Sequence, residues 1–202
     1  MAKIVKNYPV IIAGLGNPGE QYLATPHSAG FMVINEFAKK FEFPEFKMEP
    51  DGILTSQKEI NGKSVILAKP QLFMNNSGKA LAKLFLKLKI RKAKSYPFLW
   101  IINDDLDIPL GKIKIAKNRG SAGHKGAQSI IDQLKTKNFI RFRFGIAPIN
   151  EIDKKIPGDK YVLKKISPDN QAEFDKAINL AVNAIKTAID SGIEKSMTEF
   201  NQ

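Results

Sequence analysis

Two histidines are the side chains in this sequence best suited to acid–base chemistry. His27 and His124 are the only histidines among the 202 residues, and each lies in a glycine-rich segment of small residues, 25–30 and 120–126. Small neighbours leave an imidazole accessible, and histidine is the natural general base near neutral pH. A single histidine in such a segment is more often a surface or helix-capping residue, so a catalytic role requires partners elsewhere in the chain.

Acidic residues follow a short apolar segment that is typical of a buried strand. The segment 98–103 leads directly into Asp104, Asp105 and Asp107. In open α/β sheets, ligands gather at the carboxyl ends of the strands, and an acid placed there can orient a histidine and stabilise its protonated form. The three acids could instead bind a metal ion. Because the chain has no cysteine and two histidines, that alternative is the weaker one.

Polar residues also follow the apolar strand expected before residue 73. The segment 73–78 reads Phe-Met-Asn-Asn-Ser-Gly and precedes an amphipathic helix. We expect Asn76 or Ser77 to cap that helix, which leaves Asn75 free to contact a ligand.

The segment 14–19, Gly-Leu-Gly-Asn-Pro-Gly, fits the dinucleotide-binding pattern G-x-G-x-x-G. A dinucleotide site also needs a helix that opens at once and an acid about 20 residues later at a strand end. Here the next helix is expected only near Gly30, and Glu36 lies inside it. Nucleotide binding is therefore disfavoured, and the glycines are expected to allow tight turning that points Asn17 toward a pocket.

Strands and helices are expected to alternate, which predicts a single α/β domain over residues 1–202. Apolar runs predict strands at 10–14, 52–56, 64–68, 98–103, 112–116 and 141–147, with a turn at Asn61-Gly62. Apolar spacing predicts helices at 30–43, 77–90 and 123–134, and a last one from Ser167-Pro168 to Gly192. The segment 148–157 is expected to be an irregular, mobile loop.

The charge and the cysteine content of the chain limit the kinds of partner and of cellular location that we expect. Lysine and arginine number 32 against 20 acids, a formal net charge of +12, which favours a polyanionic partner such as RNA, DNA or an acidic membrane surface. A lysine-rich surface that only keeps the protein soluble is the open alternative. Because the chain has no cysteine, it cannot form disulfides. No apolar run is long enough for a membrane span, and the N-terminal residues do not resemble a secretion signal. We therefore expect a cytoplasmic protein with no membrane partner.

Taken together, these segments resemble the bacterial peptidyl-tRNA hydrolases. The resemblance extends in order and spacing from about residue 8 to residue 165. The matching residues are 14–19, Tyr22, Thr25, His27, Gly30-Phe31, Phe73-Met74-Asn75, Ser77-Gly78, Asp104, Leu106-Asp107, Pro109, His124, Gly126, Arg141, Arg143 and Gly145.

The resemblance implies a catalytic apparatus, residue by residue. His27 corresponds to the general base that activates water, and Asp104 to the acid that orients that base. Asn17 corresponds to the residue that helps to distinguish blocked peptidyl ends from free aminoacyl ends. The implied reaction is hydrolysis of the ester between peptide and tRNA, which recycles tRNA after aborted translation. The implied protein is a monomer with a twisted mixed sheet between helices and needs no metal or cofactor.

The resemblance also implies a binding site for the acceptor end and 3′ CCA of peptidyl-tRNA. Tyr22, Phe73 and Asn75 correspond to residues that line it, and Tyr22 or Phe73 could stack on the terminal adenosine. Core packing is the open alternative for both aromatic residues. The cations that could form a phosphate-binding strip are Lys112, Lys114, Lys117, Arg141 and Arg143. A plain solvated position is the open alternative for each of them.

Three positions depart from the family pattern. Pro26 and Ser28 flank the catalytic histidine where the family usually has Arg and Asn, and Lys125 replaces an Asn that contacts substrate. Lys125 can still donate hydrogen bonds, now as a cation near the acceptor-end phosphates. The departures leave one alternative open, a non-catalytic RNA-binding relative with reduced or no hydrolase activity.

Overall fold

A seven-stranded mixed sheet forms the centre of the computed structural model, which describes residues 8–90, 92–149 and 151–202. The strand order is β2-β3-β4-β1-β5-β7-β6, with β4, β1, β5 and β7 parallel and both flanks antiparallel. The strands are β1 (Val10–Gly14), β2 (Lys47–Glu49), β3 (Ile53–Ile60), β4 (Lys63–Pro70), β5 (Tyr96–Pro109), β6 (Ile113–Lys117) and β7 (Phe139–Ala147).

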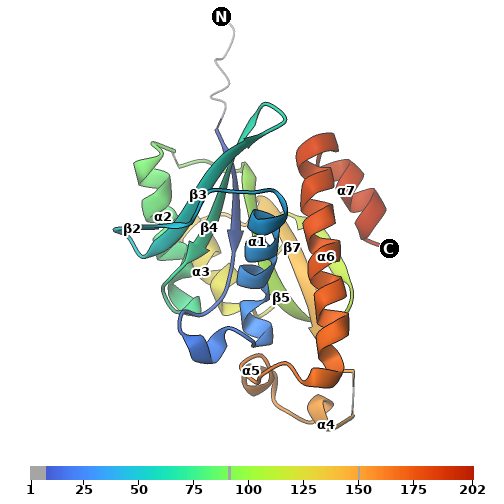
Figure 1. Cartoon of the computed structure of the whole chain (residues 1–202). Coiled ribbons are helices and arrows are strands. Elements are labelled where there is room, and N and C mark those ends of the chain that lie inside the picture. Colours follow the sequence, from blue (N-terminus) through green and yellow to red (C-terminus); the bar gives the residue numbers. More distant parts are fainter. Residues whose placement is uncertain (1–7, 91, 150) are drawn as a thin grey trace, which may run out of the picture.

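Helices cover both faces of this sheet (Figure 1). One face carries α1 (Ala29–Lys40), α6 (Pro168–Ser191) and α7 (Ile193–Phe200), and the other carries α2 (Ser77–Lys87) and α3 (Lys125–Leu134). The short helices α4 (Glu151–Lys154) and α5 (Gly158–Tyr161) lie at the end of the sheet where β1 finishes. Among the described residues, no helix has the length and apolar character needed to cross a bilayer.

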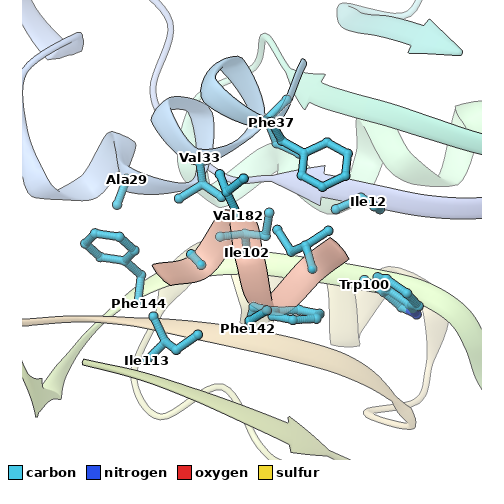
Figure 2. Packing of buried hydrophobic residues seen from close by; sticks show 14 of the residues in the cluster. Ile12, Ala29, Val33, Phe37, Trp100, Ile102, Ile113, Phe142, Phe144 and Val182 are labelled. Atoms are coloured by element: carbon cyan, nitrogen blue, oxygen red, sulfur yellow. The ribbon is translucent and has the colours of Figure 1, made fainter. Parts of the chain in front are cut away.

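The larger hydrophobic core lies between the sheet and the pair α1–α6 (Figure 2). Val33 and Phe37 of α1 and Val182 of α6 point toward Ile102 and Phe142 of the central strands, and all five are buried. Burial of such side chains contributes roughly 1.5–3 kcal/mol each. A second core beneath α2 and α3 covers the opposite face, so the central strands are buried on both sides.

The end of β1 is packed directly against the start of α1. A Cβ atom on Gly14 would lie 2.2 Å from the carbonyl oxygen of Gly30, and one on Gly30 would lie 2.3 Å from the amide nitrogen of Leu15. Gly14 and Gly30 therefore permit a close approach of the two backbones. This approach brings the turn before α1, the 3₁₀-helix η2 (Pro26–Ser28), to the carboxyl end of the sheet.

The expected architecture is confirmed, with differences at element ends. Strand β5 continues through Asp104 and Asp105 to Pro109, so these acids belong to the strand and do not follow it. Helix α3 begins at Lys125 because His124 occupies the N-cap, and α2 ends at Lys87. The turn at Asn61-Gly62 is confirmed by positive φ angles of 50° and 73°.

Several short elements were not predicted, among them β2 and α7. The segment 148–157 was expected to be irregular, and it contains the short helix α4. Its mobility stays a prediction, and Asn150 within it lies outside the described residues, as does the N-terminal segment 1–7.

Candidate active site

His27 and Asp104 meet at the carboxyl end of the sheet. Nδ1 of His27 lies 3.0 Å from both carboxylate oxygens of Asp104, across 77 residues of sequence. η2 carries the histidine, and its backbone amide donates to the carbonyl of Val162 at 2.9 Å. Since the ring donates through Nδ1, its unprotonated Nε2 is the atom available to take a proton.

His124 binds the same carboxylate from the other side. Its Nε2 lies 2.9 Å from Oδ1 of Asp104, while its Nδ1 accepts from the backbone amides of Gly126 and Ala127 at 3.1 and 3.2 Å. Two amide donors at Nδ1 require the ring proton to be on Nε2. His124 therefore caps α3 and donates to Asp104 in a single tautomer.

Asp104 is held as an anion between these two rings. Burial alone would raise its pKa, but hydrogen bonding and electrostatic attraction from His124 and His27 hold the pKa of Asp104 well below its usual range. The side chain is only 3% exposed. A buried anion with two imidazole donors is suited to stabilising positive charge that develops on His27.

The same three residues have the composition of a metal site, because their ligand atoms lie within 4.8 Å of one another. Metal binding through Nε2 of His124 would require that atom to lose its proton while Nδ1 faces two amide donors. The hydrogen-bond pattern therefore favours a proton-transfer site over a metal centre.

Asn17 presents its amide group to the same region. Its Oδ1 accepts from the backbone amide of Met74 at 3.0 Å, which leaves Nδ2 as the free end. No described residue accepts a hydrogen bond from Nδ2, and Asn17 lines the cavity at His27. The amide is thus placed to donate to a carbonyl oxygen of a bound substrate.

A cavity of about 420 Å³ lies over these residues. Phe73, Asn75 and Lys125 line it together with His27, Asp104 and Asn17. Phe73 is 58% exposed, so core packing is not its role. Tyr22 is half-buried in the 3₁₀-helix η1 (Glu20–Tyr22) and does not line this cavity, and its predicted contact with tRNA stays untested.

One wall of the cavity is apolar. Leu106 after Asp104, Leu163 after α5 and Met74 contribute to it, and both leucines are exposed. Exposed leucines in a concave site are typical of a ligand-binding surface. The predicted site did not include Leu163, because nothing local in its segment distinguishes a cavity wall from a solvated turn.

A basic groove adjoins the cavity at Ala122, which lines both. Lys114, Lys117, Arg119 and Arg143 line this groove, whose volume is about 680 Å³. Arg141, which was expected to belong to the phosphate-binding strip, is buried and faces the protein interior. It bonds to Asn103 and Gly120 instead, so the prediction for Arg141 is wrong.

Comparison with known proteins identifies the family. The family model described as peptidyl-tRNA hydrolase matches residues 11–202. The peptidyl-tRNA hydrolase of Thermodesulfovibrio yellowstonii is 40% identical to the chain, over 96% of this chain and 99% of that protein. The peptidyl-tRNA hydrolase of Solibacter usitatus is 39% identical, over 95% of this chain and 94% of that protein. The crystal structure of peptidyl-tRNA hydrolase from Acinetobacter baumannii superposes with a TM-score of 0.81 at 29% identity, over 94% of this chain and 93% of that one. With its fold, its site and its sequence in agreement, the chain belongs to the peptidyl-tRNA hydrolase family.

Proposed function

We propose that this protein hydrolyses the ester between a peptide and the 3′-terminal ribose of tRNA, with His27 as general base. The observation that carries the proposal is the orientation of His27. Its Nδ1 is bound to Asp104, and its Nε2 is left to the cavity. The family assignment supports the same reaction.

The proposed mechanism uses one water molecule. Nε2 of His27 takes a proton from the water as its oxygen attacks the ester carbonyl carbon, and Asp104 stabilises the imidazolium that forms. The bond between the carbonyl carbon and the ribose oxygen then breaks, and the imidazolium returns the proton to that oxygen. The products are a free peptide carboxyl and a tRNA with its 3′ hydroxyl restored.

Asn17 is proposed to position the peptide or stabilise the developing oxyanion through its free Nδ2 group. Phe73 and Asn75 are proposed to hold the 3′ CCA, with Tyr22 as a more distant contact. Lys125 and the basic groove of Lys114, Lys117 and Arg143 are proposed to bind acceptor-end phosphates. We further propose that residues 1–202 form one domain that acts as a cytoplasmic monomer without metal or cofactor.

The alternative is an RNA-binding relative without turnover. A binding protein would need the basic groove and Phe73, but it would have no use for an oriented His27–Asp104 pair or for the free Asn17 amide. Retention of all of these groups in one cavity favours catalysis.

The test is hydrolysis of an N-acetylated aminoacyl-tRNA by the wild type and by His27→Ala. General-base catalysis contributes about 10²–10⁴-fold, and kcat should fall by that amount in the variant. Because His27→Ala also removes one hydrogen-bond donor from the buried Asp104, Tm should fall, and kcat is compared at a temperature at which circular dichroism shows both proteins folded. Equal activity of the two proteins would refute the mechanism, and RNA binding by an inactive wild type would establish the alternative.

A further inference from the structure

Arg141 is a buried cation on the strand beside β5, which carries Asp104. It lies on β7, in register with Ile101 of β5, and only 1% of the residue is exposed. Burial lowers its pKa to about 10 despite the attraction of Asp105, so the guanidinium is still charged at neutral pH. Burying a charge costs several kcal/mol unless specific partners compensate it, so the contacts of Arg141 indicate its purpose.

The first contact acts on the strand that carries Asp104. Nε of Arg141 donates to Oδ1 of Asn103 at 3.2 Å, and Nδ2 of Asn103 donates to the backbone carbonyl of Asp104 at 2.7 Å. Because a guanidinium can only donate, it requires the oxygen of the Asn103 amide to face it. The amide nitrogen must then face Asp104, so Arg141 sets the orientation of the group that holds the catalytic backbone.

The second contact acts on the loop that carries His124. A terminal nitrogen of Arg141 donates to the backbone carbonyl of Gly120. Gly120 lies in the loop between β6 and α3, four residues before His124, whose Nε2 donates to Asp104. The other terminal nitrogen lies 3.6 Å from Oδ2 of Asp105 and has no hydrogen-bond partner among the described residues.

We propose that Arg141 is a positioning residue for hydrolysis, because it joins β5 at Asn103 to the β6–α3 loop at Gly120 and thereby sets where Asp104 meets His124 and His27. The inference rests on the proposed function and deepens it. Arg141 acts through geometry, since the groups that lower the pKa of Asp104 are the two histidines and not Arg141. A direct contact with RNA is excluded by the burial of the side chain.

Arg141→Lys is the informative variant, because lysine keeps the charge but lacks the planar fork that reaches Asn103 and Gly120 together. We expect kcat to fall on the order of 10- to 100-fold with KM nearly unchanged, as a small misplacement of catalytic groups would cause. Arg141→Met, which lacks the charge as well, should show at least the same loss. Arg141→Lys decides the question if Arg141→Met fails to fold.

A second readout separates positioning from stability. Because the chain has two histidines, their ¹⁵N imidazole resonances can be assigned by comparison with His27→Ala. The wild type should show His124 protonated on Nε2 and His27 protonated on Nδ1. Arg141→Lys should show mixed tautomers for His27, whose ring is oriented by Asp104, whereas the amides of α3 should keep His124 in one tautomer. Val182→Ala, in the core on the opposite face of the sheet, is the matched control. It should lower Tm without changing kcat or either tautomer.

Two results would overturn the inference: an unchanged kcat in folded Arg141→Lys, whether or not KM rises, or a lowered kcat with both tautomers as in the wild type. A wild type without turnover would refute the proposed hydrolase function alone. The resonances of Arg141→Lys would still decide whether Arg141 positions the two histidines.

Discussion

His27 and His124 face each other across one carboxylate, with ring centroids 5.0 Å apart and an interplanar angle of 41°. Oδ1 of Asp104 lies within hydrogen-bonding distance of both rings. The two histidines differ in the surroundings of the ring nitrogen that does not bond to Asp104. The second nitrogen of His124 is occupied by the first amides of α3, whereas Nε2 of His27 is directed to the cavity. This asymmetry favours the proposed roles, with proton transfer at His27 and support from His124.

Asp104→Asn should reduce kcat about 10²–10⁴-fold, because the amide lacks the charge that stabilises the imidazolium of His27. Single-turnover hydrolysis of N-acetylated aminoacyl-tRNA measures the effect. Since the two residues act as a unit, the double variant with His27→Ala should be no slower than His27→Ala alone. Additive losses would show that Asp104 and His27 act independently.

The contribution of Asp104 to stability should depend on acid pH. Its pKa is lowered in the folded protein, so the carboxylate stabilises the fold above its unfolded pKa of about 4, and this stabilisation is lost as the pH falls through the folded pKa. Urea unfolding of the wild type and Asp104→Asn should therefore differ more at about pH 5 than at about pH 3. An equal difference at both values would contradict the lowered pKa.

Lys125→Asn should make substrate binding less sensitive to salt. If the exposed lysine neutralises one phosphate of the acceptor end, its removal reduces the slope of log KM against log salt concentration by roughly 1. Lys125→Arg is the control and should keep the slope. The prediction fails if Asn and Lys give the same salt dependence, and a large rise in kcat for Asn would instead mark Lys125 as a loss of function.

Phe73→Ala should raise KM about 10-fold, because stacking of one base on an aromatic ring contributes roughly 1–3 kcal/mol. The ring is exposed, so Tm should not change. Leu86→Ala, on the exposed side of α2 and outside the cavity, should leave both KM and kcat unchanged. A fall in Tm without a change in KM would assign Phe73 to packing.

Gly30→Ala should destabilise the fold by about 2–3 kcal/mol, because the added Cβ would lie 2.3 Å from the amide nitrogen of Leu15 and 2.5 Å from the carbonyl oxygen of Ile102. These are backbone atoms, which cannot turn aside as a flexible side chain can. Gly120→Ala is the matched control, since nothing lies within 4 Å of its added Cβ. Urea unfolding should show a change of less than about 0.5 kcal/mol for the control.

Local sequence patterns determined much of this protein. Apolar runs and helical spacing predicted the strands β1, β5 and β7 and the helices α1, α2, α3 and α6, because these elements bury one or both faces and the side-chain period records that burial. The polar residues that follow β1 and those in the second half of β5 indicated a site at the carboxyl edge of the sheet. Residue types and their order also indicated the family and the pair His27 and Asp104.

Only the tertiary structure decided what each charged group faces. Arg141 and Arg143 occupy the same strand two residues apart, yet the first is buried against Asn103 and Gly120 and the second lies in the basic groove. His124 is set in one tautomer by the first amides of α3, and the cavity wall at Leu163 comes from a turn far from Asp104 in sequence. Such environments depend on contacts between residues distant in the chain, whereas periodicity and composition report the neighbourhood of each residue along it.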